Sequence, residues 1–223
     1  FERIARRLEN ALDTFTVSLL GAGNDATGLG TDPGFAQAVC TQLSDLTGVT
    51  FTFDSDPMDG LNAVDTPLFA HGLLKSLAVH YWKTMHDFVL MTSGPRGGIR
   101  EIALPAVAPG SSIMPGKVNP TMAQLGALIA DGVASSDAAV TASAMSGWFS
   151  EGMRQSTILK ALLDSGNLLD CVMRKNIEKI ITGIAAQPAF SEKEASRSQA
   201  LLVLVQKVLG KAIADRVFAV MQQ

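Results

Sequence analysis

One long helical stretch, from about residue 61 to residue 92, constrains the fold of this 223-residue chain more than any other feature. Apolar side chains recur along it at steps of three and four residues: Leu74, Leu77, Tyr81, Met85 and Phe88. This is the period of an α-helix with one apolar face. About thirty residues of helix span roughly 45 Å. Helices of that length are typical of extended bundles, so the stretch predicts a bundle.

The same helical period returns in other parts of the chain. It predicts further helices over residues 2–20, 33–47, 120–145, 154–182 and 191–222. Ser191 to Glu194 is typical of a capping box at the start of the last helix. Residues 48–57 are expected to be extended without joining a sheet, and the glycine-rich connector 21–34 is expected to allow close helix packing. The predicted fold class is all-α, a long-helix bundle with negligible strand.

Composition excludes two classes of partner. The formal net charge of −3 provides no basic field, so a nucleic-acid partner is not expected. No apolar run approaches the roughly 18 residues that span a bilayer, so no membrane segment is expected. Cys40 and Cys171 match no disulfide or metal pattern, and free thiols of this kind indicate a reducing, cytoplasmic location.

Apolar residues make up 47% of the chain and charged residues only 17%. A helix that is apolar most of the way round has to be buried. We therefore expect the long helices to pack against identical helices of other subunits. The three histidines, His71, His80 and His86, are nine and six residues apart, which does not place them on one helix face. No metal site and no cofactor are expected.

The sequence GSSIMPGKVNP, from Gly110 to Pro120, has the properties of an anion-binding loop. It runs into a predicted helix, for which Asn119 is a suitable N-cap and Pro120 a suitable first-turn residue. The N-terminus of a helix with Lys117 beside it attracts an anion, because its free N–H groups and its dipole are both positive there. A carboxylate or a phosphate is the expected ligand, with a serine close enough to react with it.

This string resembles the signature of the fumarase/aspartase superfamily, in the form carried by class II fumarases and aspartate ammonia-lyases. The segment SGPRGGIREIALP, which precedes it, is similar to the family as well. The resemblance implies a homotetramer with shared active sites, a small dicarboxylate substrate and the release of fumarate. It also implies that Ser111 is the catalytic base, that Ser112 lies at the substrate, and that Lys117 and Asn119 bind its carboxylates. Gly110 and Gly116 would be hinges for loop closure.

Several features depart from the family pattern. Two family segments, an SSND-type segment and a G-R/K-T-H-x-x-D-A segment with an essential histidine, are not found in this sequence. Gln124 stands where the family commonly has a glutamate. We therefore expect the central and later part of a longer protein, with an incomplete site. Residues 1–182 would form the central bundle domain, with its first part missing, and residues 183–223 the start of a small C-terminal helical domain.

The substrate stays open between alternatives. Gly116 and Thr121 favour a fumarate hydratase-like dehydration of L-malate. The alternatives are deamination of L-aspartate, as in aspartate ammonia-lyases, and a non-catalytic helical assembly module that keeps the loop as a scaffold.

Overall fold

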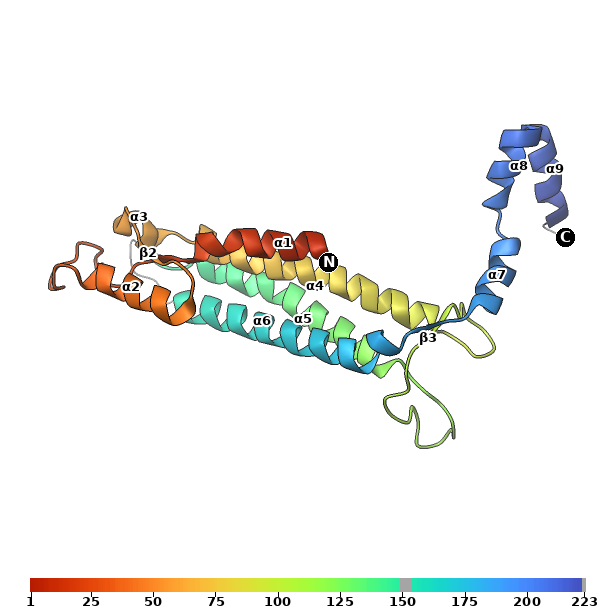
Figure 1. Cartoon of the computed structure of the whole chain (residues 1–223), viewed down its shortest axis with the longest axis horizontal. Coiled ribbons are helices and arrows are strands. Elements are labelled where there is room, and N and C mark those ends of the chain that lie inside the picture. Colours follow the sequence, from red (N-terminus) through yellow and green to blue (C-terminus); the bar gives the residue numbers. More distant parts are fainter. Residues whose placement is uncertain (149–153, 222–223) are drawn as a thin grey trace. The chain divides into compact units, whose positions relative to one another are not determined.

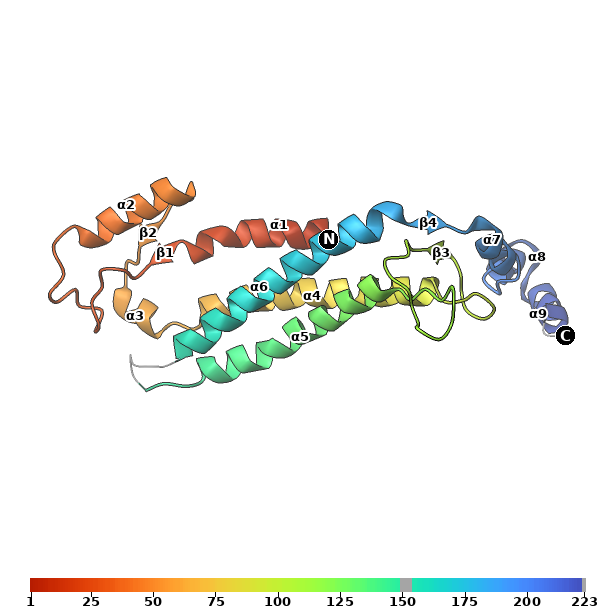
Figure 2. The same cartoon turned by 90° about the horizontal axis from the view of Figure 1, so that it is seen from below.

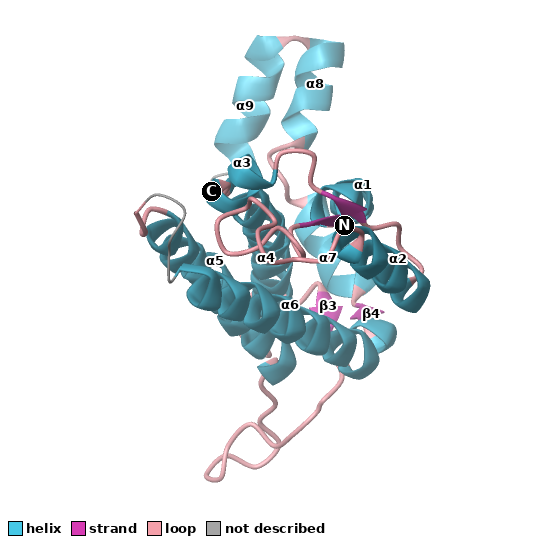
Figure 3. Cartoon of the chain, turned by 90° about the vertical axis from the view of Figure 1, so that its left-hand side faces the viewer, coloured by secondary structure: helices cyan, strands magenta, loops and turns pink. Residues whose placement is uncertain are grey.

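The computed structural model describes residues 1–148 and 154–221 (Figure 1). Over these residues the chain is mainly helical, and the strands are limited to two short pairs, which Figure 3 distinguishes by colour. The prediction of an all-α long-helix bundle with negligible strand is therefore confirmed.

The element bounds are as follows. The helices are α1 Glu2–Ala11, η1 Leu12–Phe15, α2 Phe35–Thr47, α3 Pro57–Asn62, α4 Asp65–Met91, α5 Thr121–Ala144, α6 Arg154–Lys179, η2 Ile181–Gly183, α7 Pro188–Ser196, α8 Leu201–Leu209 and α9 Lys211–Met221. The strands are β1 Val17–Ser18, β2 Thr52–Phe53, β3 Ile102–Ala103 and β4 Ala185–Ala186. β1 pairs with β2 in parallel, and β3 pairs with β4 antiparallel.

The chain divides into two compact units. The first contains Phe1–Thr84 and Leu125–Arg174, and the second contains Met85–Gln124 and Lys175–Gln223. The sequence-based boundary between residues 182 and 183 stays a prediction. Within the first unit, α1 and the parts of α4, α5 and α6 that belong to it lie along one another in both Figure 1 and Figure 2.

The core of the first unit is built around small side chains on α5. Ala127 and Ala130 are buried there, with Val133 and Val140 further along the helix. Small residues let neighbouring helices approach closely, and the facing helices contribute larger buried side chains. Tyr81 of α4 is one of them, and its ring packs edge-on against Phe1 at 6.5 Å between centroids.

The N-terminal half corrects two predictions. The helix expected over residues 2–20 ends at Ala11 and continues only as the 3₁₀ turn Leu12–Phe15. The expectation that residues 48–57 stay outside a sheet is wrong, because Thr52 donates its backbone N–H to Thr16 O at 3.0 Å and so starts the β1–β2 pair. The glycine-rich connector packs as expected. A Cβ on Gly21 would lie 2.8 Å from Cβ of Ala36 in α2, closer than such atoms can approach.

The C-terminal segment corrects two more. Residues 191–222 were expected to form one helix, but α7, α8 and α9 are separate helices. Gly210, with a φ of 85°, ends α8 and separates it from α9. The capping box at Ser191 is wrong as well. Helix α7 already begins at Pro188, whose fixed φ suits a first helical turn. Ser191 lies inside the helix and donates its hydroxyl to Gln187 O at 3.5 Å.

None of the helices in the described ranges 1–148 and 154–221 is long and apolar enough to cross a membrane.

Candidate functional site

The loop that the sequence singles out is closed at its base. It lies between β3 and α5, and both ends belong to the second unit (Figure 1). The backbone N–H of Gly110 donates to Lys117 O at 2.7 Å, and the side-chain Nδ2 of Asn119 donates to Gly110 O at 2.9 Å. An antiparallel bridge between Pro109 and Val118 lies beside these bonds. Residues 111–117 therefore form a loop whose two ends are fastened together.

Ser111 points its hydroxyl oxygen back at the loop backbone. Its Oγ accepts hydrogen bonds from the N–H groups of Ile113 at 3.1 Å and Met114 at 3.2 Å. The side chain is half-buried, at the point where the loop leaves its fastened base. Two donors aimed at one hydroxyl oxygen stabilise negative charge on it, because a hydrogen bond to the charged form favours that form.

Lys117 supplies the positive charge of the loop. It is exposed, and its backbone N–H closes a turn onto Met114 O at 3.3 Å, with Gly116 at a φ of 78° inside that turn. Within the described ranges, no carboxylate lies at ion-pair distance from its ammonium group. Ser112, the next residue in the loop after Ser111, is exposed.

Two open cavities flank the loop. One, of about 490 Å³, is lined by residues 106–109 and 114–118 together with Ser111, so it brings together the predicted base and Lys117. The other, of about 190 Å³, is lined by residues 102–105 and 118–120 with Thr92 and Gln187. Asn119 lines the second cavity and Ser112 lines neither. The four predicted residues therefore share one loop but not one cavity.

Asn119 does not cap α5. The first helical hydrogen bond runs from Gln124 N–H to Pro120 O at 3.0 Å, so Pro120 holds the N-cap position and Asn119 lies one residue outside the helix. The prediction of an Asn119 cap is therefore wrong. The helix starts one residue later than predicted, and Nδ2 of Asn119 donates to Gly110 O, which holds the side chain at the base of the loop.

Thr92 and Gln187 are polar lining residues that sequence reasoning missed. They come from chain positions far from the loop, and no local spacing connects them with it. Gln187 reaches this place because its backbone N–H donates to Glu101 O at 2.8 Å, beside the β3–β4 pair.

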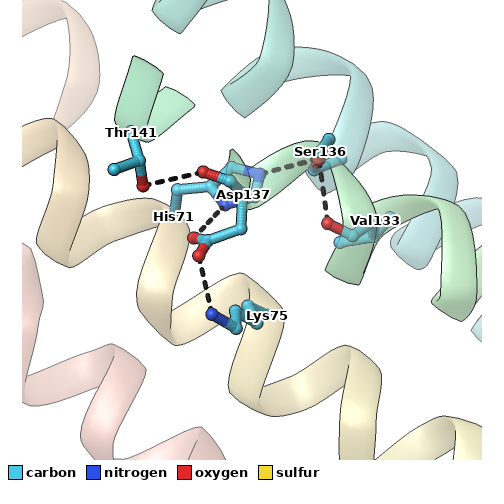
Figure 4. Close-up of polar contacts among 7 residues, drawn as sticks. His71, Lys75, Val133, Ser136, Asp137 and Thr141 are labelled. Carbon is cyan, nitrogen blue, oxygen red and sulfur yellow. Dashed lines mark hydrogen bonds and ion pairs between the residues drawn. The ribbon is translucent and has the colours of Figure 1, made fainter. Parts of the chain in front are cut away.

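A second polar cluster, also missed, lies in the first unit (Figure 4). His71 of α4 is fully buried, and its Nδ1 lies 3.0 Å from Oδ1 of Asp137 on α5. Its Nε2 lies 3.0 Å from Ser136 Oγ and 3.2 Å from Ser165 Oγ. Lys75 Nζ is 2.6 Å from Oδ2 of Asp137. The cluster ties three helices together.

Two of the protons in this cluster can be assigned. An ionised carboxylate only accepts, so Nδ1 of His71 carries a proton and donates it to Asp137. Ser136 directs its hydroxyl to Val133 O at 2.8 Å. Ser165 Oγ lies 3.2 Å from both Nε2 of His71 and Oγ of Ser136. Burial raises the pKa of Asp137, but the hydrogen bonds and positive charge of Lys75 and His71 outweigh this and lower it overall.

The resemblance to known lyases is borne out by comparison with other proteins. A family model described as "Lyase" matches residues 1–134, which include the loop. Fumarate hydratase class II of Bacillus subtilis is 32% identical over 216 residues, covering 97% of this chain and 47% of the relative. Its counterpart in Chromobacterium violaceum is 36% identical over 184 residues, covering 82% and 40%.

Solved structures agree with this relationship. The cobalt-bound fumarate lyase:delta crystallin of Brucella melitensis superimposes with a TM-score of 0.90 at 30% identity, covering 97% of this chain and 47% of that one. The class II fumarase of Schistosoma mansoni shares the fold with a TM-score of 0.92 at 23% identity, covering 96% and 48%. The chain thus spans less than half the length of these relatives. By the family match and these identities, the chain belongs to the lyases of the fumarase/aspartase superfamily.

Proposed function

We propose that this chain contributes the serine loop of a lyase that interconverts L-malate and fumarate. The observation that carries the proposal is the pair of backbone N–H groups, from Ile113 and Met114, that donate to Ser111 Oγ. The names of the relatives in Bacillus subtilis and Chromobacterium violaceum support malate as the substrate. The activity is proposed for an assembly in which the loop meets the remaining substrate-binding groups.

The difficult step in this reaction is the removal of a proton from carbon. The carbon lies beside a carboxylate, and the carbanion that forms is tolerated only when its charge spreads into that carboxylate as a doubly charged aci-carboxylate. The site therefore needs a base and a concentration of positive charge. The loop offers one group of each kind in a single cavity, Ser111 and Lys117.

Ser111 is proposed as the base. A serine hydroxyl is a weak base and needs its alkoxide stabilised by its surroundings. The two N–H donors stabilise the alkoxide more than the hydroxyl, because they point at the atom that bears the charge. Both donors belong to the loop itself, so the stabilisation comes with the fold of residues 111–114.

Lys117 and Asn119 are proposed to bind the substrate carboxylates, and Ser112 is proposed to contact the substrate. Lys117 is exposed and lines the same cavity as Ser111, and its ammonium group offers three donors to an anion. The side-chain nitrogen of Asn119 carries two N–H groups, of which one is used by Gly110 O. Each residue therefore keeps donors for a ligand.

A homotetramer with shared active sites and a cytoplasmic location belong to the same proposal. Large apolar side chains are exposed on α5 and α6 of the first unit, including Leu128 and Leu163. Exposed apolar surface of this kind marks an interface. Residues from other subunits would complete the site, and Cys40 and Cys171, both unpaired as free thiols, suit a reducing compartment.

The experiment is a fumarate absorbance assay on the whole protein with L-malate and, separately, with L-aspartate. We expect turnover of L-malate, and a loss of about 100-fold or more in kcat for Ser111→Ala, because general-base catalysis contributes about 10²–10⁴. Ser198→Ala, at a serine outside the loop that is half-buried like Ser111, is the matched control and should keep wild-type rates. Turnover of L-aspartate instead would move the assignment to an ammonia-lyase. Full activity of Ser111→Ala would refute its role as the base.

A further inference from the structure

The neck of the serine loop is the place where Gly110, at its start, meets residues 117–119, at its end. Gly110 fastens this neck with both of its backbone polar groups. Its N–H donates to Lys117 O at 2.7 Å. Its carbonyl oxygen accepts from the side-chain Nδ2 of Asn119 at 2.9 Å. One residue at the start of the loop is thus bound to two residues at its end, and these are the two proposed carboxylate ligands.

Only glycine fits at this position. A Cβ added to Gly110 would lie 2.8 Å from Lys117 O, 3.0 Å from the backbone N of Asn119 and 3.1 Å from its Cγ. Cβ atoms do not approach backbone atoms that closely, so a larger residue would force the two ends of the loop apart. The neck depends on close backbone approach and on the Asn119 hydrogen bond together.

The chemistry of Asn119 suits a dual contact. Within the described part of the chain, its side chain makes this one hydrogen bond. An amide nitrogen carries two N–H groups, so one can hold Gly110 O while the other meets an anion. The side chain is half-buried and lines the 190 Å³ cavity. It can therefore hold the neck and face a ligand at the same time.

We propose that Asn119 is a positioning residue, which clasps the loop neck through Gly110 O and so sets the places of Ser111 and Lys117. Ser111 follows Gly110 directly, and Lys117 is bound to Gly110 through its carbonyl group. A shift at the clasp therefore moves the base and the cation together. This role rests on the proposed function only where it concerns turnover, because the clasp itself exists without substrate.

Trypsin cleavage after Lys117 reports the clasp without any need for activity. The Lys117 carbonyl is held by Gly110 N–H, so cleavage requires the neck to open. Asn119→Asp keeps the shape of the side chain but, when ionised, cannot donate to Gly110 O. A net hydrogen-bond contribution of about 1 kcal/mol corresponds to about a fivefold rise in the open fraction, and hence in the cleavage rate.

We expect Asn119→Asp and Gly110→Ala each to speed cleavage by about fivefold or more, and the double variant to be cleaved no faster than the faster single one. Gly132→Ala is the matched glycine control, because a Cβ there meets no atom within 4 Å, and it should leave the rate unchanged. A cleavage rate of Asn119→Asp equal to that of the wild type would overturn the clasp. So would a double variant whose rate increase equals the product of the two single increases.

Kinetics then separate positioning from binding. Gly110→Ala removes no group that could bind substrate, so it is expected to lower kcat by about tenfold or more with little change in KM, through misplacement of Ser111 and Lys117. An unchanged kcat together with faster cleavage would contradict the positioning role. If the wild-type protein converts neither L-malate nor L-aspartate, the proposed function fails while the cleavage result still decides the clasp.

Discussion

His71 Nδ1 and Asp137 Oδ1 lie 3.0 Å apart, and this contact joins α4 to α5 at a fully buried imidazole. Ser165 of α6 approaches the other ring nitrogen, at 3.2 Å. A buried polar group costs free energy unless it is hydrogen-bonded, so helix positions that break these bonds are disfavoured. The cluster therefore fixes how the three helices are aligned within the first unit.

Removing the carboxylate should destabilise the fold. Asp137→Ala leaves Nδ1 of the buried His71 without an acceptor, which costs about 1–3 kcal/mol in the free energy of unfolding. Urea denaturation of the wild type and the variant measures the difference. Asp131→Ala, at an exposed position of the same helix, is the control and should change the free energy by less than about 0.5 kcal/mol. Equal stability of Asp137→Ala and wild type would contradict a structural role for the cluster.

Acid should weaken the same contact. The pKa of Asp137 is lowered in the folded state, so the carboxylate contributes stability that is fully present above its unfolded pKa and is lost as pH falls through the folded pKa. The advantage of wild type over Asp137→Asn in unfolding free energy should be constant above about pH 5 and shrink below it. Urea titrations at several pH values measure this. An advantage that grows on acidification would show that the sign is wrong.

The sequence predicted the long helices because their information is local. Residues 61–92, 120–145 and 154–182 carry an apolar repeat with few breakers, and α4, α5 and α6 occupy most of these ranges. Breaks that depend on a single conformation were missed, as at Gly210. Strand pairing was missed as well, because β1 finds β2 across more than thirty residues and only the folded chain brings them together.

The site shows the same division. The string from Gly110 to Pro120 indicated the loop and its candidate residues. Only the folded structure showed that Ser111 and Lys117 line one cavity. The sequence predicted Asn119 as the N-cap of α5. A local pattern cannot show that the helix starts one residue later, or that the Asn119 side chain binds Gly110 O. Gln187 and the partners of His71 come from distant positions, and no spacing rule connects them.

Apolar side chains exposed on α5 and α6 should mark the subunit contact. Leu128 is 68% exposed and Leu163 is 56% exposed, so neither is needed for the core of the first unit. Burying a charge at an interface without a partner is strongly unfavourable, and Leu128→Glu with Leu163→Glu should dissociate the proposed tetramer. Light scattering after size exclusion measures the mass. Lys160→Glu, at an exposed charged position of α6, is the control and should stay assembled. A wild-type monomer would refute the tetramer.

Lys117 should act on the transition state more than on binding. Lys117 and Ser111 line the same cavity, and the substrate carboxylate that Lys117 is proposed to bind gains a second charge only as the proton leaves. Lys117→Met should therefore lower kcat and kcat/KM together by about 10²–10³, the usual cost of one such donor. Steady-state kinetics with L-malate measure both quantities, and Lys211→Met, outside the loop, is the control. A raised KM with an unchanged kcat would instead mean that Lys117 binds substrate and transition state equally well. In that case the charge that stabilises the aci-carboxylate has to come from a group outside this loop.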